Sequence, residues 1–438
     1  MLDASVGITT EKNSYLAGKK VAQKALDGMS SKPKLAILAI DSLTRRHFNN
    51  AEVVRGIREI LGPNITLIGS TVNGIIVNDR FALRSIGLML LGGDLLIDKT
   101  FNYNNSRLEY EGIAEKIYQQ YLNLHQKDNS LMLMFQDGMK FPPEILAKQK
   151  TLNSRAVSML SGLVKRFFKR QLEEFKETGM GMPSVQELLE LLYTKGFDLP
   201  VIGNIATNVR DYDSVEFFND EIGNDNVVGV LLSGVGSTKF GYGFAAGAES
   251  TGKICRVTKN IGNFLLRIED KPALLGLCST ANIQKESLRE LRGSNYLNYH
   301  LILGTREKID DKDYVHLTAT ITDPNLEGLV NTGFPFDKVP NDIEIFQSNM
   351  QILHKTAETS VKQALSTISN PKFLLGFDCA IRFFAYGDNL PRIVKTINNT
   401  IDNDIPRMIV GSGGEILGTK DMNYYFNNFT FITLAGGD

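Results

Sequence analysis

Near its C-terminus the chain reads Phe377-Asp378-Cys379-Ala380-Ile381-Arg382 and then Ile409-Val410-Gly411-Ser412-Gly413-Gly414-Glu415-Ile416. The first run predicts the end of a buried strand, with an aspartate and an arginine four residues apart at its tip. The second predicts a short apolar strand that breaks into a glycine turn, where positive φ is allowed and another group can approach the backbone closely. Helical spacing of apolar residues predicts a helix between them, over about 391–403. A last strand is predicted over 428–435.

The same pattern occurs twice more along the chain. An apolar strand at 34–40 ends in Asp41-Ser42-Leu43-Thr44-Arg45, in which Asp41 and Arg45 have the spacing of Asp378 and Arg382. A helix over about 51–61 and the turn Ser70-Thr71-Val72-Asn73-Gly74 follow it. A weaker copy runs from a strand at 131–135 to a strand at 227–232. This repetition of strand, acidic tip, helix, glycine turn and strand predicts a fold built from copies of one unit.

Composition predicts an ordinary soluble globular protein. The 438 residues suggest two or three domains, and 42 % hydrophobic and 22 % charged residues are typical values. A formal net charge of −1 provides no field that would attract nucleic acid or an anionic membrane. The three cysteines form no close pair, which favours a reducing compartment. No apolar run is long enough to span a bilayer and no signal peptide is recognised, so a cytoplasmic location is expected.

Two regions depart from the repeated pattern. Residues 144–196 predict a helical insert, in which a basic amphipathic helix over 156–175 is either a solvated surface helix or a docking site for a partner. Residues 240–335 are rich in strand signals. The glycine-rich stretch Gly234–Gly247 between these regions is the predicted domain boundary.

Familiar catalytic and metal-binding motifs are weak in this sequence. Gly247-Ala248-Glu249-Ser250-Thr251-Gly252-Lys253 resembles a phosphate-binding loop, but Ile254 replaces the required Ser or Thr and a strand is predicted to follow, so a hairpin turn is favoured. The five histidines are scattered, so no metal site and no cofactor are expected. Cys379 is interpreted as a small buried residue, with a reactive thiol activated by Arg382 as the alternative.

The acidic tips and glycine turns are therefore the best candidates for a ligand site. Asp378 and Arg382 either pair with each other or meet the two ends of a zwitterionic ligand. The amides of Gly411–Gly414 can face an anion, and Glu415 can accept from an amine. The candidate residues are Asp378, Cys379, Arg382, Ser412, Gly413, Gly414 and Glu415, together with Ser70 and Thr71 of the first copy.

These motifs, taken in order, resemble the FIST family, named for F-box and intracellular signal transduction proteins. The C-terminal run Cys379-Ala380-Ile381-Arg382, the turn Gly411–Ile416 and Asn428-Phe429-Thr430 are similar to motifs that end the family's C-terminal part. Ile68–Gly74 and Pro200-Val201-Ile202-Gly203-Asn204-Ile205-Ala206 resemble motifs of its N-terminal part, although Asn204 stands where a second glycine is usual. The resemblance covers roughly residues 30–438.

The resemblance implies an α+β protein of two FIST-like halves, at 1–240 and 241–438, whose mixed sheets are covered by helices. It also implies a cytoplasmic sensory protein without catalysis, which binds a small molecule such as an amino acid and signals through a partner protein. No fused kinase, methyl-accepting or F-box segment is recognised. The alternatives are an adaptor that docks a partner on residues 150–195 and an enzyme that uses Cys379.

Overall fold

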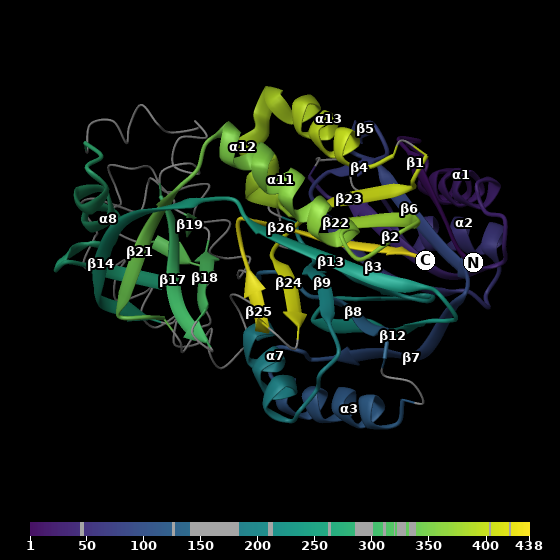
Figure 1. The fold of residues 1–438 in the computed structure, drawn as a ribbon, viewed down its shortest axis with the longest axis horizontal. Coiled ribbons are helices and arrows are strands. Elements are labelled where there is room, and N and C mark those ends of the chain that lie inside the picture. Colours follow the sequence, from purple (N-terminus) through teal and green to yellow (C-terminus); the bar gives the residue numbers. More distant parts are fainter. Residues whose placement is uncertain are drawn as a thin grey trace.

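The computed structural model contains three six-stranded sheets of the same design and a fourth sheet inserted into the last repeat (Figure 1). It describes residues 1–43, 48–124, 128–140, 184–208, 213–261, 264–284, 301–309, 312–318, 320–321, 330–332, 339–402, 404–419 and 422–438. Within these residues, the expectation of an α+β fold with mixed sheets covered by helices is confirmed.

Each of three consecutive repeats forms most of one sheet. Repeat 1 comprises β1 (Leu2–Thr9), α1 (Ser14–Asp27), β2 (Pro33–Asp41), α2 (Asn50–Leu61), β3 (Thr66–Val72), β4 (Ile75–Val77), β5 (Arg80–Ala82) and β6 (Ile86–Gly93). Repeat 2 comprises β7 (Leu95–Asn104), α3 (Tyr110–Leu122), β8 (Ser130–Gln136), α7 (Val185–Thr194), β9 (Val201–Ile205), β10 (Glu216–Phe218), β11 (Glu221–Gly223) and β12 (Asn226–Gly234). Repeat 3 comprises β13 (Lys239–Ala246), α11 (Met350–Leu365), β22 (Pro371–Cys379), α12 (Ala380–Tyr386), η1 (Gly387–Asn389), α13 (Leu390–Thr400), β23 (Arg407–Ser412), β24 (Glu415–Thr419), β25 (Met422–Asn427) and β26 (Thr430–Gly437).

The three sheets have the same strand order because each repeat sends a hairpin into its neighbour. The orders are β1-β6-β2-β3-β10-β11, β7-β12-β8-β9-β24-β25 and β13-β26-β22-β23-β4-β5. In each sheet the third and fourth strands are parallel, and the exchanged hairpin pairs antiparallel with the fourth strand. Repeat 1 thus completes the sheet of repeat 3, repeat 3 that of repeat 2, and repeat 2 that of repeat 1. The three units form a closed ring, and no repeat can complete its sheet alone.

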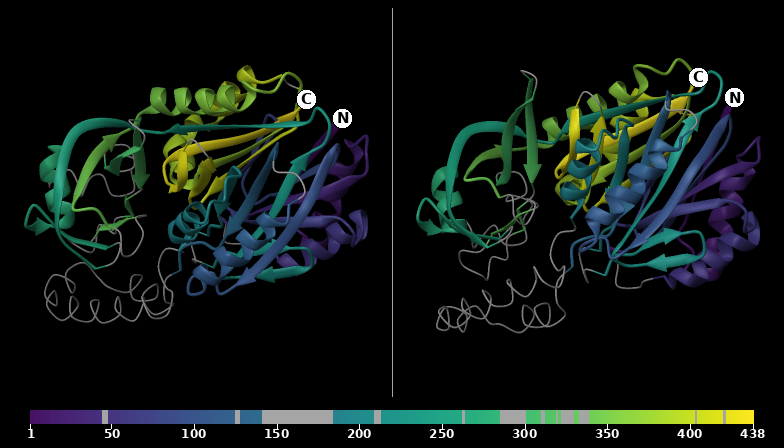
Figure 2. Two further views of the ribbon diagram at one scale, coloured as in Figure 1. Left: turned by 60° about the horizontal axis from the view of Figure 1, so that its bottom comes forward. Right: turned by 90° about the horizontal axis from the view of Figure 1, so that it is seen from below.

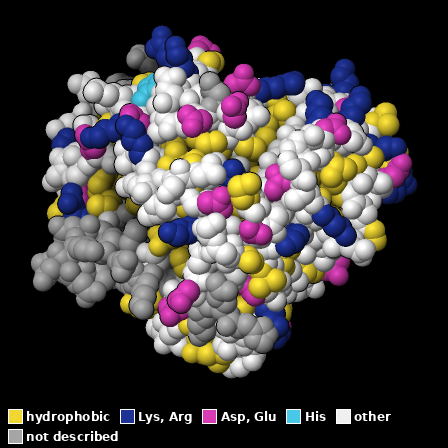
Figure 3. Space-filling model, turned by 45° about the vertical axis from the view of Figure 1, so that its right-hand side comes forward, with side chains coloured by type: hydrophobic (Ala, Val, Ile, Leu, Met, Phe, Trp, Pro, Cys, Tyr) yellow, Lys and Arg dark blue, Asp and Glu magenta, His cyan; other side chains and the backbone are white. Residues whose placement is uncertain are grey.

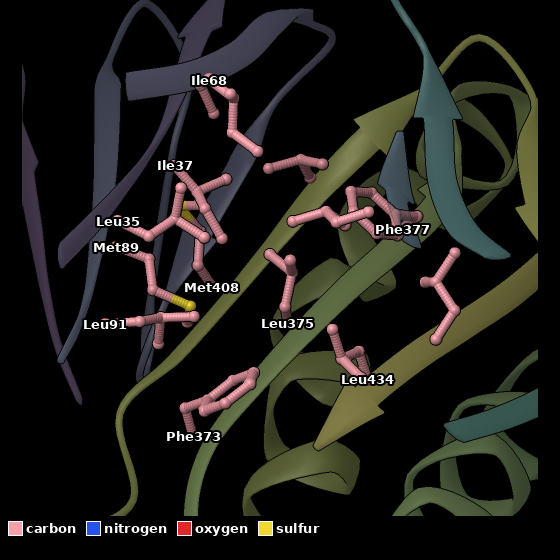
Figure 4. Packing of buried hydrophobic residues seen from close by; sticks show 14 of the residues in the cluster. Leu35, Ile37, Ile68, Met89, Leu91, Phe373, Leu375, Phe377, Met408 and Leu434 are labelled. Carbon is pink, nitrogen blue, oxygen red and sulfur yellow. The ribbon is translucent and has the colours of Figure 1, made fainter. Parts of the chain in front are cut away.

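The inner faces of the three sheets share one hydrophobic core. Figure 4 shows Leu35, Ile37 and Met89 of the first sheet facing Leu375 and Phe377 of the third. Residues of β8, β9 and β12 from the second sheet belong to the same cluster. The outer faces bury separate clusters beneath the helices: α1 and α2 cover the first sheet, α3 and α7 the second, and α11 to α13 the third. This arrangement accounts for strands that are apolar on both faces.

Asparagine residues fix the start of three helices. The side chains of Asn13, Asn49 and Asn349 precede α1, α2 and α11, and each accepts a hydrogen bond from an amide of the first helical turn. Such a cap satisfies an amide that has no partner within the helix and stabilises it by about 1 kcal/mol. α1 and α11 occupy the same place in repeats 1 and 3, so the two repeats share this local signal.

The fourth sheet belongs to an inserted unit between β13 and α11, which lies beside the three-sheet body (Figures 1 and 2). Its elements are β14 (Glu249–Ile261), β15 (Phe264–Ile268), β16 (Lys271–Pro272), α8 (Ala273–Ala281), β17 (Ile302–Ile309), β18 (Lys312–Thr318), β19 (Thr320–Ile321), β20 (Val330–Thr332) and β21 (Asp342–Gln347). It has its own small core, which includes Cys255, Leu277 and Ile343.

Several expected boundaries are wrong. The apolar run at 86–97 predicts a single strand by its sequence, but it forms two strands, β6 and β7, which are separated at Gly93-Asp94. By contrast, helical spacing predicts a helix between 101 and 127, and α3 lies within that range, after 101–104 have ended β7. The sequence also predicts a helix over 346–366, but 346–347 are the last residues of β21 and α11 begins only at Met350. Arg382 lies on a short helix, α12, that sequence spacing does not predict.

Some expectations fall outside the described residues. Residues 141–183, which hold most of the predicted insert at 144–196 and the docking helix at 156–175, are among them. Arg45, the supposed counterpart of Arg382, is another. The boundary at Gly234–Gly247 stays a prediction, and β13 within it pairs with the last strand of the chain. Among the helices described, none has the length and apolar character needed to cross a membrane. On the face in Figure 3, acidic and basic side chains are intermixed.

Candidate functional site

The glycine turns of the three repeats meet at one place and bond to one another in a cycle. The Asn73 amide of repeat 1 donates to the Gly411 carbonyl of repeat 3 at 2.8 Å. The Gly413 amide of repeat 3 donates to the Ile205 carbonyl of repeat 2 at 2.9 Å, and the Thr207 amide of repeat 2 donates to the Thr71 carbonyl of repeat 1 at 3.0 Å. Candidate residues that lie more than 300 positions apart in sequence are thereby brought to a common junction.

Sheet register identifies the equivalent residues of the repeats. Ala39 pairs with Ser70, Phe135 with Asn204 and Phe377 with Val410. Ala39, Phe135 and Phe377 are therefore equivalent positions on β2, β8 and β22. The residues two positions after them are Asp41 in repeat 1, Asp137 in repeat 2 and Cys379 in repeat 3, and these three are equivalent as well. The sequence comparison of Asp41 with Asp378 is corrected by this register: Asp41 is the counterpart of Cys379, and Asp378 corresponds to Gln136. The Asp-x-x-x-Arg spacing is not a shared feature of the structural unit.

Asp378 and Arg382 form a closed triangle with Tyr386, a residue that sequence analysis did not select. Arg382 Nε donates to Asp378 Oδ1 at 2.6 Å, Arg382 Nη2 to the Tyr386 hydroxyl at 2.8 Å, and that hydroxyl to Asp378 Oδ2 at 2.6 Å. Asp378 lies near the end of β22, and α12 places Arg382 and Tyr386 four residues apart on one helix face. All three side chains are at most 1 % exposed. Of the two interpretations left open by the sequence, the geometry shows the internal pair.

Burial dominates the electrostatics of this junction. It raises the pKa of the Asp378 carboxyl, in opposition to the attraction of Arg382. Burial also raises the pKa of Glu415 well above its ordinary value, and the nearby Asp378 charge adds to the effect. The pKa of the Cys379 thiol is raised by burial and then by Glu415. A thiol in this environment stays protonated, so the structure gives Cys379 none of the activation that a nucleophile requires.

The turn of repeat 3 uses much of its hydrogen-bonding capacity internally. The Ser412 hydroxyl donates to the Gly414 carbonyl and accepts from the Gly414 amide at 3.1 Å. The Gly413 amide is occupied by Ile205. A Cβ at Gly414 would lie 2.0 Å from the Phe426 ring, so a side chain there would require that ring to move. The amides of Gly413 and Gly414 therefore serve the junction between repeats, and the expected anion-binding role of this turn stays a prediction.

Ser70 and Thr71 connect the first repeat to the second. The Ser70 hydroxyl lies 3.3–3.4 Å from the side-chain amide of Asn204, and both side chains are fully buried. Thr71 Oγ1 accepts from the Val215 amide at 3.0 Å. The hairpin residues Glu216 and Glu415 are the sheet partners of Ser70 and Asn204. Four buried polar side chains thus lie side by side across two sheets, whereas the third sheet has Ile75 and Val410 at the matching positions.

Unpartnered polar atoms remain inside this junction. Arg382 Nη1 and Glu415 Oε1 have no hydrogen-bond partner, although Glu415 Oε2 accepts from the amide and the hydroxyl of Thr430. In repeat 2, Glu216 Oε1 and both amide atoms of Gln136 are also unpartnered. Buried polar groups in native structures are nearly always hydrogen-bonded, since each unmet group costs about 1–3 kcal/mol. Arg382 thus has one unpartnered donor nitrogen, and Glu415 has one unpartnered carboxyl oxygen.

The neck of the inserted unit lies against Arg382. Gly247 joins β13 to the insert, and its amide donates to the Phe429 carbonyl at 2.8 Å. A Cβ on Gly247 would stand 2.3 Å from Arg382 Nη1. Ser348, where the chain returns from the insert, donates to the Gly247 carbonyl at 2.5 Å. The outgoing and returning chain segments of the neck are therefore held together beside Arg382.

Other chemistries find little support in the described residues. No group of three or more His, Cys, Asp or Glu side chains in that part of the chain is placed to hold a metal ion. Lys253 of the phosphate-loop-like run lies within strand β14, as the hairpin interpretation predicted, and its ammonium donates to the Ala281 carbonyl at 3.0 Å. No helix N-terminus follows it, so the backbone cannot surround a phosphate there.

Sequence analysis missed Tyr386, Asn204, Glu216 and Gln136. Tyr386 has the i+4 spacing from Arg382 that a helix would place on one face, but the short helix itself was not predicted. Glu216 and Gln136 could have been found by extending the repeat alignment to the second copy, where low similarity concealed the hairpin.

Comparison with protein families gives one match. The model of the FIST N domain matches residues 34–271, which is more than half of the chain. The matched range includes the acidic tips and turns of repeats 1 and 2 and the first strands of the inserted unit. Comparison with curated proteins gives no match.

Proposed function

Because the chain belongs to the FIST family, a family of sensory domains in signal transduction, we propose that it is a non-catalytic sensor of a small zwitterionic ligand. The ligand class is an α-amino acid or a similar metabolite. Three buried free cysteines support a cytoplasmic, reducing location.

The observation that carries this proposal is the unpartnered pair at the junction. Arg382 Nη1 offers a hydrogen bond to a carboxylate, and Glu415 Oε1 offers to accept one from an ammonium group. Both side chains are 0 % exposed, so a ligand held between them is surrounded by protein, where charge-assisted bonds are strong. Asp378 takes part indirectly, because it orients Arg382 through the Nε bond. Ser412, Gly413 and Gly414 hold the turn from which Glu415 extends.

The neck offers a route from ligand to output. A ligand carboxylate on Arg382 Nη1 would lie close to Gly247 and would change the contacts of both neck strands. The inserted unit would then shift relative to the three-sheet body, and a separate signalling partner would detect the shift. Such a shift requires the ligand to bind one arrangement more tightly than the other.

A thermal-shift screen tests the proposal. The twenty amino acids are added to the wild-type protein and to Arg382→Met, with Arg407→Met as a control. Arg407 is a buried arginine of the same sheet, at the opposite end of β23 from the turn. A ligand at one hundred times its dissociation constant stabilises the folded protein by about 2.7 kcal/mol. We expect at least one amino acid to stabilise the wild type and Arg407→Met but not Arg382→Met. No stabilisation by any of the twenty would contradict the proposal.

A further inference from the structure

Repeat 2 contains a carboxyl group held in the same way as Glu415 of repeat 3. The Asn226 amide, at the start of β12, donates to Glu216 Oε2 at 3.3 Å. The Thr430 amide, at the start of β26, donates to Glu415 Oε2 at the same distance. In both glutamates Oε1 is unpartnered and the side chain is fully buried. Each glutamate also occupies the same position of its exchanged hairpin, as the sheet partners Ser70 and Asn204 show.

The corresponding tip of repeat 1 has an apolar residue in its hairpin and a strand-tip carboxylate whose oxygens are both hydrogen-bonded. Ile75 replaces the glutamate in the hairpin of this repeat. The strand-tip carboxylate of Asp41 accepts from the Gly74 amide at 2.9 Å, from the Leu43 amide at 3.1 Å and from the Arg84 amide. Both of its oxygens are engaged. The spare oxygen of Glu216 is therefore not a general consequence of the fold.

Glu216 and Glu415 differ in whether the basic side chains around them are already paired with another carboxylate. Asp137 Oδ2 accepts hydrogen bonds from Arg107 Nε at 3.1 Å and from Arg107 Nη2 at 3.0 Å. The same oxygen forms an ion pair with Lys140 Nζ at 2.8 Å. The other Asp137 oxygen accepts from Ser214 at 3.1 Å. Arg107 and Lys140, which act electrostatically on Glu216, are thus both paired with Asp137. Among the residues that the structure describes, this tip therefore has no counterpart of the unpartnered Arg382 nitrogen.

Gln136 provides a neutral group at the same tip. It is fully buried next to Asp137 in sequence, and neither its amide oxygen nor its amide nitrogen has a partner. By sheet register it occupies the position that Asp378 has in repeat 3. A buried primary amide can donate and accept at once, and it pairs well with another amide. The unpartnered amide of Gln136 is an observation independent of the acidic residues around it.

We propose that the tip of repeat 2 is a second binding site, which takes a ligand with a primary ammonium group and a neutral carboxamide or hydroxyl group in place of a carboxylate. Glu216 Oε1 accepts from the ammonium, and the Gln136 amide pairs with the neutral group. A free carboxylate is disfavoured, because the basic side chains at this tip are engaged with Asp137 and burying an unpaired charge is costly. Repeats 2 and 3 thus bind different chemical classes on one structural plan.

The test compares amino acids with their α-amides, which keep the ammonium group and replace the carboxylate by a neutral carboxamide. Thermal shifts and equilibrium dialysis are measured with both panels on the wild type, Glu216→Gln, Gln136→Met and Glu415→Gln. We expect at least one amino-acid amide to bind the wild type, and to bind at least tenfold more weakly to Glu216→Gln and Gln136→Met. Glu415→Gln is expected to bind it normally.

A wild-type competition experiment keeps the proposal testable if a variant does not fold. Binding of the amide is measured with and without a saturating amino acid that occupies repeat 3, and the two should not compete. The proposal is overturned if no amide binds, if an amino acid displaces the bound amide, or if Glu415→Gln but not Glu216→Gln abolishes binding. Failure of every amino acid to bind would count against repeat 3 alone, and the amide panel would still decide the case of repeat 2.

Discussion

The tips of repeats 1 and 3 occupy the same place in the same unit, yet their polar groups are used differently. In repeat 1, Asp41 accepts from three backbone amides and the hairpin contributes the apolar Ile75. In repeat 3, Glu415 and Arg382 are buried with one atom each unpartnered. The comparison shows that the fold can satisfy its buried polar groups at a tip, as repeat 1 does. Unpartnered buried polar atoms destabilise the protein, so their presence in repeats 2 and 3 supports the proposal that these two tips bind ligands.

The largest expected effect comes from Arg382→Met. It leaves the buried Asp378 without its cation and removes the Tyr386 contact, and breaking a buried pair in this way costs about 3–5 kcal/mol. The free energy of unfolding is measured by urea denaturation. The double variant Asp378→Leu/Arg382→Met should recover much of the loss, because no unpaired charge remains. A double variant as unstable as the single one would show that packing, rather than the ion pair, stabilises this tip.

Asp41→Ala tests the opposite member of the comparison. The substitution leaves amides of Gly74, Leu43 and Arg84 without an acceptor, so we expect a loss of about 2–4 kcal/mol in urea denaturation, based on about 1–3 kcal/mol for an unmet buried group. Ligand binding to the folded fraction should be unchanged. A loss of ligand affinity with little loss of stability would mean that repeat 1, too, is a binding site.

The buried glutamates predict an unusual dependence of stability on pH. Their pKa values are raised well above 4.5, chiefly by burial, so the folded protein retains protons that the unfolded chain releases. Stability from these groups is fully present below the unfolded pKa and declines as pH rises from about 4.5 towards the folded values. Glu216→Gln/Glu415→Gln should flatten this decline and stabilise the unliganded protein near neutral pH by about 1–3 kcal/mol.

Thermal denaturation in a series of buffers measures this slope. Asp3→Asn, which removes a carboxyl group outside the junction, is measured alongside it for comparison. A decline with rising pH that persists in the double glutamine variant would place its origin in other groups.

The smallest effect is expected for Cys379. Its thiol is 1 % exposed and its pKa is raised by burial, so iodoacetamide at neutral pH should label it no faster than the buried Cys255 and Cys278. Mass spectrometry of the native protein measures the three rates. Selective, rapid labelling of Cys379 would revive the enzyme hypothesis and would mean that the tip of repeat 3 opens in solution.

The repeated unit of the fold could be predicted from the sequence, but the exchange of hairpins between repeats could not. Glycine turns, buried strands and acidic strand tips are local signals, and they located the three copies. The hairpin exchange depends on which neighbour each short strand pairs with, a long-range choice that Ile75–Val77 does not encode by itself. Asp378, Arg382 and Glu415 were found because their residue types are unusual beside glycine turns. Glu216 and Gln136 were missed because their roles depend on register across sheets, and α12 was missed because seven residues give too little periodicity.

The most direct test is a crystal structure of the wild-type protein grown with a mixture of amino acids at millimolar concentration. We predict continuous ligand density at the junction, with a carboxylate about 3 Å from Arg382 Nη1 and an ammonium group about 3 Å from Glu415 Oε1. Arg382 and Glu415 bonded only to each other or to ordered water, with no ligand between them, would contradict the sensory site and leave only the closed ring of three repeats.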